Sequence, residues 1–233
     1  MVAATGSFGN PYVPALPGQG RFTGRLQHVA SYRNPGHYAG ERVVVVGAGN
    51  SAMQVGYELA QVATVTLTTR HPVTFHPQRR GGHDLHYWLA ATGFDLLPPE
   101  WLRHYLGDRW VVDTGKYQHA LQTEQLDRRP MFTAFDRDHI IWPDGTREKV
   151  DTVLFATGYR PHLDYLSPLG ALEDGMPRHV GEISTTHPGL VYVGLEFQRS
   201  FSSNTLRGVH RDAEHVIAPL AAHVRNAPAV VGV

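Results

Sequence analysis

The sequence predicts an α/β fold built around a parallel β-sheet, and three neighbouring features carry this prediction. Residues 43–46 are four consecutive valines, the β-branched run expected of a strand that is covered on both faces. The apolar residues that follow recur at three- and four-residue steps, as on one stripe of a helix: Ala52, Val55, Leu59 and Val62. Residues 64–69 then resemble a second short strand, which completes a β-α-β unit of about 28 residues, close to the roughly 30 typical of this motif.

The rest of the chain gives weaker signals. The Pro- and Gly-rich stretch 9–20 predicts a surface connection. Short helices are expected at 83–91 and 99–106, and no chemistry is assigned to the stretch between His71 and Pro130. Further strands are expected at 140–142, 152–156 and 190–193, with a hairpin turn at 143–146. A final helix is also expected, with a kink at Pro219. The apolar stripe of this helix includes Val209, Ala213, Val216, Ile217, Leu220 and Val224.

Composition excludes several classes of function. The 21 basic and 21 acidic side chains balance, so no overall field favours nucleic acid or an anionic membrane. The absence of cysteine excludes thiol-based redox chemistry in this chain, so an organic cofactor must carry any electrons. Fifteen histidines occur without the cysteine or glutamate spacing of a metal site, and no metal is expected. Without an apolar run of membrane length or a signal peptide, the sequence predicts a soluble, cytoplasmic protein.

The turn after the valine run has the composition of a dinucleotide-binding site. Gly47 would allow the tight turn, and Gly49 would let a pyrophosphate approach the backbone at the start of the helix. Asn50 and Ser51 can add side-chain donors, and Ala52 stands where a small residue lets helix and strand pack closely. The alternative is a structural strand-turn-helix without ligand. The context favours a Rossmann-like domain, in which a parallel sheet forms the middle of three layers.

The end of the second strand indicates which nucleotide would bind. An acidic residue at this place would accept a hydrogen bond from the ribose 2'-OH of NAD, but no Asp or Glu occurs between Glu58 and Asp84. The strand ends instead in Thr69 and Arg70. A guanidinium can pair with a 2'-phosphate, so the sequence favours NADP. An ordinary exposed charge at the strand end is the alternative for Arg70.

A longer pattern lies upstream, in residues 22–33, which read FTGRLQHVASYR. These residues match F-x-G-x-x-x-H-x-x-x-Y/F-K/R, and in this they resemble the flavin-containing monooxygenases, the class B flavoproteins that also include the Baeyer-Villiger enzymes. Tyr32 stands where Baeyer-Villiger members usually have Trp, so the match is closer to the branch that oxygenates heteroatoms. The resemblance covers nearly the whole chain.

The resemblance implies an NADP-binding domain inserted in part of a second dinucleotide-binding domain, as in the FAD/NAD(P) fold with two such domains. Thr5-Gly6 and Thr157-Gly158 resemble the two crossings between the domains. On this basis residues 1–8 and 158–233 form a partial FAD-binding domain. Residues 9–157 form the NADP-binding domain, which includes an interdomain linker at 20–40.

The resemblance also implies cofactors and chemistry. NADPH would reduce FAD, a flavin C4a-(hydro)peroxide would form with O2, and one oxygen atom would pass to a small organic substrate. No side chain is assigned a catalytic role. His28 and Tyr32 are expected in the linker near the nicotinamide, with a buried, hydrogen-bonded histidine as the alternative for His28. The loop 200–204 either lines the flavin or caps the last helix.

One departure from the family pattern concerns the start of the chain. Family members begin with a glycine fingerprint for FAD well ahead of the first Ala-Thr-Gly, whereas this sequence reaches Thr5 and Gly6 almost at once. We therefore expect a chain without its N-terminal FAD segment, completed by a second chain or assembled as a homo-oligomer. The alternative function is a non-catalytic NADP-binding remnant or regulatory module that holds no flavin.

Overall fold

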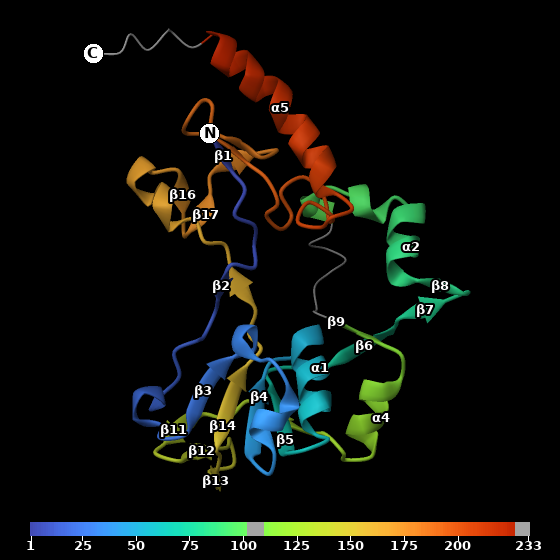
Figure 1. Cartoon of the computed structure of the whole chain (residues 1–233), viewed down its shortest axis with the longest axis vertical. Coiled ribbons are helices and arrows are strands. Elements are labelled where there is room, and N and C mark those ends of the chain that lie inside the picture. Colours follow the sequence, from blue (N-terminus) through green and yellow to red (C-terminus); the bar gives the residue numbers. More distant parts are fainter. Residues whose placement is uncertain (102–109, 227–233) are drawn as a thin grey trace. The chain divides into compact units, whose positions relative to one another are not determined.

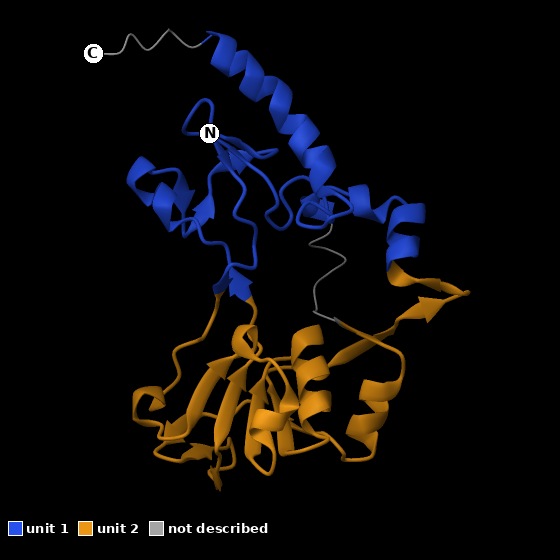
Figure 2. Ribbon diagram, viewed as in Figure 1, with its two compact units in different colours: residues 1–10, 86–107, 159–233 blue, residues 11–85, 108–158 orange. Residues whose placement is uncertain are grey.

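The computed structural model describes residues 1–101 and 110–226 and divides into two compact units (Figure 2). Unit 1 comprises residues 1–10, 86–107 and 159–233, and unit 2 comprises residues 11–85 and 108–158. The divisions after residues 10 and 158 lie close to the expected domain boundaries. Among the described residues, 86–101 group with unit 1, and the expected NADP-binding segment from 9 to 157 remains a prediction.

Unit 2 is built on the predicted parallel sheet (Figure 1). Its five strands lie in the order β10 (Asp127–Pro130), β5 (Thr64–Thr69), β4 (Arg42–Val46), β14 (Thr152–Phe155) and β3 (Arg25–His28). Within the expected linker 20–40, β3 pairs in parallel with β14 as an edge strand of this sheet. Short 3-10 helices flank β3: η1 (Gln19–Arg21), η2 (Val29–Ser31) and η3 (Pro35–Tyr38).

Helices α1 (Asn50–Leu59) and α4 (Lys116–Gln122) pack on one face of this sheet. The valine run explains why both faces are covered, because successive side chains of a strand point to opposite sides. Val43 and Val45 share a core with α1, in which Ala52 and Leu59 are fully buried. Val62 does not continue the expected stripe: it follows the end of α1 and is 38% exposed.

The other face of the sheet is covered by strands rather than by helices. β11 (Ala134–Asp136), β12 (His139–Ile141) and β13 (Arg147–Lys149) form a small antiparallel sheet. Val44 and Val46 share a second core with Trp142, next to the predicted hairpin turn that joins β12 to β13. The three layers of unit 2 are therefore helices, a parallel sheet and an antiparallel sheet.

Glu148 of β13 links this antiparallel layer to the central sheet. Its carboxylate accepts hydrogen bonds from Nε1 of Trp142 at 2.7 Å and from Nε of Arg42 at 2.6 Å. Arg129 completes the group: its guanidinium lies 3.3 Å from the carboxylate and 4.0 Å from the centre of the Trp142 ring. Partial burial raises the pKa of Glu148, but the donors and charges of Arg42, Trp142 and Arg129 outweigh it and hold the pKa below its ordinary 4.5.

We expect Glu148→Gln to lower the free energy of unfolding at pH 7 by about 1.5 kcal/mol, because it removes the charge that these donors contact at a partly exposed site. A carboxylate with a lowered pKa contributes stability above 4.5 and loses it as pH falls through the lowered value. The difference between wild type and variant should therefore shrink in acid. Urea denaturation at a series of pH values measures it, with the exposed Glu124→Gln as control. A difference that grows in acid would contradict this account.

The segment after β5 contains short elements that the sequence left without chemistry. β6 (Thr74–Pro77) pairs in parallel with β9 (Trp110–Asp113), and β7 (Arg79–Arg80) forms a hairpin with β8 (His83–Asp84). The helix expected at 83–91 begins two residues later, as α2 (Leu85–Ala91). The helix expected at 99–106 lies mostly outside the described residues.

Unit 1 contains a four-stranded sheet in the order β1 (Val2–Ala3), β20 (Val191–Tyr192), β19 (Ile183–Ser184) and β18 (His179–Val180). β20 overlaps the strand expected at 190–193. A small core with Tyr192 and Leu195 lies under it. The other short elements are β2 (Asn10–Pro11) and β15 (Tyr159–Arg160) where the chain passes between units, η4 (Phe94–Leu96), η5 (Asp164–Leu169), and the hairpin β16 (Leu172–Glu173) and β17 (Met176–Pro177).

The last helix, α5 (Val209–Asn226), forms as expected, but only part of its predicted apolar stripe is buried. Ile217 is 59% exposed and Val224 is 65% exposed. The residues that α5 buries are Asp212 and Val216. Among the described residues, no helix combines the length and apolar character needed to cross a membrane.

Candidate functional site

The turn between β4 and α1 requires glycine at its first position. Gly47 has a φ of +148°, and a Cβ atom added there would lie 2.5 Å from the carbonyl oxygen of Ala156. Ala156 directly follows β14, the neighbour of β4 in the sheet. Gly47 is therefore explained by the fold itself: it lets the chain turn tightly beside the end of an adjacent strand.

Gly49 is not explained in the same way. Its φ of −92° is open to any residue, and a Cβ atom added there would meet no atom within 4 Å. The space beside Gly49 lies at the first turn of α1, which no side chain caps and which contains no acidic residue. Backbone N–H groups at such a helix start, together with the helix dipole, favour an anion. The geometry thus fits a phosphate group at Gly49.

Of the two polar residues that follow Gly49, Asn50 is hydrogen-bonded to a neighbouring strand and Ser51 is exposed. Asn50 accepts a hydrogen bond from the backbone N of Val112 at 2.9 Å through Oδ1, which ties the start of α1 to β9 and leaves Nδ2 as the side-chain donor. Ser51 is exposed at the first turn, and Ala52 is fully buried against the sheet, as its predicted packing role requires.

The two predicted site residues at the end of β5 differ in their exposure to solvent. Thr69 is buried, and its hydroxyl accepts a hydrogen bond from Nε of Arg128 at 2.9 Å. Arg70 is exposed directly after the strand. Because β4 and β5 are parallel neighbours, their carboxyl ends place Arg70 at the same edge of the sheet as the glycine turn.

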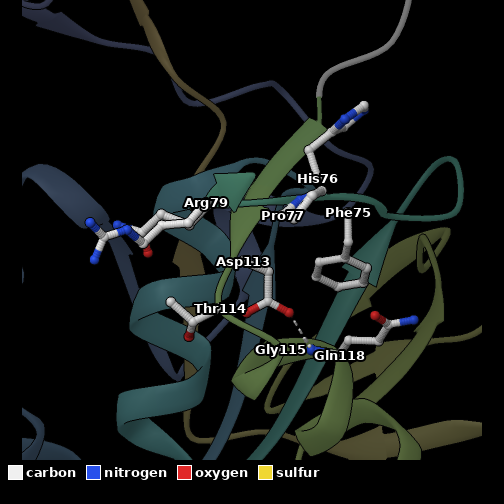
Figure 3. Close-up of a pocket in the computed structure, with 9 residues that line it drawn as sticks. Phe75, His76, Pro77, Arg79, Asp113, Thr114, Gly115 and Gln118 are labelled. Carbon is white, nitrogen blue, oxygen red and sulfur yellow. Dashed lines mark hydrogen bonds between the residues drawn. The ribbon is translucent and has the colours of Figure 1, made fainter. Parts of the chain in front are cut away.

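Two hollows lie in unit 2, in and beside the segment that follows Arg70. The larger, a cavity of about 450 Å³, is formed by β6, the end of β9 and the start of α4 (Figure 3). Asp113 lies between the Phe75 ring and the Arg79 side chain in this view, and it accepts a hydrogen bond from the backbone N of Gln118 at 3.0 Å.

The smaller hollow, of about 170 Å³, is lined by Asn50 and Gln54 of α1 and by Lys116. The ammonium group of Lys116 lies 5.3 Å from the ring centre of Tyr57 and 4.8 Å from that of Tyr117. A positive charge is therefore held close to the first turn of α1. Sequence reasoning missed both hollows, because no periodicity or motif marks the residues between 71 and 130.

His28 lies at the carboxyl end of β3, and both of its ring nitrogens have partners. Nδ1 accepts a hydrogen bond from the backbone N of Ala30 at 3.1 Å, so the proton is on Nε2, which lies 3.0 Å from the carbonyl oxygen of Gly158. Burial lowers the pKa of His28, although the contact with Gly158 opposes this. His28 is thus a neutral, buried residue next to a predicted domain crossing.

Tyr32 packs against the core beside α1, with its ring centre 5.7 Å from that of Tyr38. Burial raises the pKa of Tyr32, and the Glu58 carboxylate adds to this effect. The hydroxyl therefore stays protonated. These contacts give Tyr32 a packing role in unit 2, and contact with a nicotinamide remains a prediction.

The residues at the two predicted crossings are held by local hydrogen bonds. Thr157 donates to the carbonyl oxygen of Tyr12, and the carbonyl of Gly158 accepts from the backbone N of Tyr12 at 3.0 Å. In unit 1, the hydroxyl of Thr5 donates to the carbonyl oxygen of His162 at 3.3 Å, and Gly6 follows it. Their predicted contact with a cofactor is not tested by this geometry.

Comparisons with known proteins agree with the fold. Residues 1–93 match the family model described as pyridine nucleotide-disulphide oxidoreductase. The chain is 28% identical to indole-3-pyruvate monooxygenase YUCCA4 of Oryza sativa over 97% of its length. It aligns with the structure of the flavin-containing monooxygenase from Stenotrophomonas maltophilia over 96% of its length, with 26% identity and a TM-score of 0.76. The chain is therefore similar to flavin-dependent monooxygenases over nearly its whole length.

The chain spans only part of these relatives: 57% of the rice protein and 62% of the bacterial structure. It spans 65% of a CzcO-like oxidoreductase of Geobacillus kaustophilus, to which it is 28% identical. The disulphide chemistry named by the family model has no thiol to use in this chain, which contains no cysteine. The oxygenases are therefore the more informative relatives.

Proposed function

We propose that unit 2 binds NADPH and that the chain is the NADPH-binding part of an FAD-dependent monooxygenase, which transfers one atom of O2 to a small organic molecule. The observation that carries this proposal is the glycine turn. Gly47 is required by the neighbouring strand, whereas the space at Gly49 serves no internal contact of the described residues. A ligand phosphate accounts for that space.

The pyrophosphate of NADPH would lie against the first turn of α1. Backbone N–H groups there would donate to it, with Ser51 and the amide of Asn50 as side-chain donors. Lys116 adds a positive charge at the same hollow as Asn50. Arg70 would contact the 2'-phosphate, and the lack of an acidic residue near it would disfavour NADH.

FAD would bind to unit 1. By family resemblance Thr5, Gly6, Thr157 and Gly158 would lie at the two crossings between the domains. Unit 1 contains the strand β20 and the helix α5, which support the expected return of the chain to an FAD-binding domain. Bound FAD would supply the redox chemistry, by accepting a hydride from NADPH and activating O2. The residues of this chain would bind and orient the nucleotide, and we assign none of them a proton-transfer role. A second copy or a second chain is proposed as partner.

We expect Arg70→Gln to weaken NADPH binding by about tenfold, because it removes a charge-assisted hydrogen bond to the 2'-phosphate. Arg70→Glu should weaken it further, since a carboxylate repels the phosphate. NADH binding should change little in either variant. Fluorescence titration with both nucleotides measures these effects, and the exposed Arg21→Gln serves as control.

Two results would contradict the proposal. The first is an absence of NADPH binding by the wild-type chain. The second is equal NADPH affinity after Arg70→Glu. The flavin part is tested separately, by equilibrium dialysis of the chain with FAD and by the visible spectrum of the product. NADPH binding without any FAD binding would support the non-catalytic alternative for the chain by itself.

A further inference from the structure

The turn between β18 and β19 places an acidic residue in an unusual backbone conformation. Gly181 and Glu182 are the two residues of this tight hairpin, with φ values of +53° and +71°. Such turns favour glycine, asparagine or aspartate at positive φ, because a Cβ atom is crowded there. A glutamate in this place indicates that its side chain makes an interaction that compensates for the strain.

That side chain is completely buried. Glu182 has 0% exposure, and neither carboxyl oxygen has a partner within normal hydrogen-bond geometry in the described part of unit 1. Its acidic neighbour is Asp212, which lies in the first turn of α5 and is 2% exposed. Asp212 accepts a hydrogen bond from Arg199 at 3.2 Å through Oδ1, whereas Oδ2 has no such partner.

We propose that Glu182 and Asp212 share one proton, and that this shared proton fastens the first turn of α5 to the β18–β19 turn. One guanidinium can neutralise only one of two adjacent buried carboxylates, and an unpaired buried charge is strongly unfavourable. The neutral carboxyl of Glu182 can donate to Oδ2 of Asp212. Loss of the proton at alkaline pH would leave two like charges and loosen α5.

The imidazole that contacts the backbone of Glu182 does not supply a second positive charge. The backbone N of Glu182 donates to Nδ1 of His179 at 3.2 Å, and burial lowers the pKa of His179, so that imidazole is neutral. His215 of α5 packs over Gly181. Burial, followed by the hydrogen bond and charge of Asp212, raises the pKa of Glu182 to about 9, while Arg199 opposes the shift.

The shared proton matters because α5 has few other anchors. Asp212 and Val216 are its buried residues, and the side chains of Ile217 and Val224 are exposed. A change at Asp212 therefore acts on one of the main attachments of the helix. This inference requires no cofactor and is independent of the proposed function.

Infrared spectroscopy tests the protonation directly. We expect the carbonyl band of a protonated carboxyl at pH 7 in the wild type, its disappearance in Glu182→Gln, and its retention in Glu214→Gln, an exposed glutamate of α5. In Asp212→Asn the band should titrate at lower pH, because the neighbouring negative charge is gone. A wild-type spectrum without this band at pH 7 would overturn the proposal.

Stability against pH provides the second test. A carboxyl with a raised pKa contributes stability fully below 4.5 and loses it as pH rises through about 9. Between these values the unfolding equilibrium constant of the wild type should rise by about tenfold per pH unit relative to Glu182→Gln. Hydrogen exchange should locate the alkaline loosening in α5. Parallel pH profiles of wild type and Glu182→Gln would refute the shared proton.

Discussion

Replacing Gly47 with alanine is expected to lower the free energy of unfolding by on the order of 3 kcal/mol. The added methyl group would lie 2.5 Å from the carbonyl oxygen of Ala156, and the backbone has a φ of +148° that alanine avoids. Both the turn and the end of β14 would have to move. Urea denaturation followed by circular dichroism measures the loss.

Gly49→Ala is the matched comparison, because the two glycines lie two residues apart in the same turn. Its methyl group would meet nothing, so the stability change should be about 1 kcal/mol or less, the cost of a poorer helix cap. NADPH binding should weaken by about tenfold, because the methyl group occupies the space of the phosphate. Similar stability losses in both variants, or unchanged NADPH affinity in Gly49→Ala, would contradict the proposal that a ligand phosphate occupies the space beside Gly49.

Arg207→Ala is expected to destabilise unit 1 by about 3 kcal/mol, because it removes the partner of a buried carboxylate. Nε and Nη2 of Arg207 donate to the two carboxylate oxygens of Asp95 at 2.5 and 2.8 Å. The Asp95 side chain is 4% exposed. Hydrogen exchange should rise most in residues 86–96, which this ion pair holds against the loop before α5.

The exposed ion pair between Arg147 and Asp136 provides the control, since Arg147→Ala should cost no more than about 1 kcal/mol. Replacing both partners by neutral residues, as in Asp95→Asn with Arg207→Gln, should restore part of the lost stability. If Arg207→Ala and Arg147→Ala have equal effects, the buried pair does not hold the segment.

The sequence predicted the elements whose signals are local. The valine run at 43–46 and the stripe through Ala52 and Leu59 repeat with the period of their own secondary structure, so no distant residue is needed to recognise them. The same holds for the glycine turn and for Arg70, whose places follow from the order of strand, turn and helix.

The sequence could not predict the features that depend on distant partners. The predicted apolar stripe of α5 includes Ile217 and Val224, which are exposed, because amphipathic spacing does not show which packing surface is present. Residues 25–28 of the expected linker form the strand β3 because they pair with β14, which lies more than 120 residues later in the chain. The two hollows depend on how β6, β9 and α4 meet.

By itself, the sequence determined a β-α-β unit with a glycine turn between its first strand and helix, because local periodicity and glycine placement specify both. Only the tertiary structure decided that an antiparallel sheet covers the second face of unit 2 and that residues 86–101 belong to unit 1. It also brought together Asp95 with Arg207 and Glu182 with Asp212. These pairs join residues that are distant along the chain, and the free energy of a buried charge depends on its neighbours in space rather than in sequence.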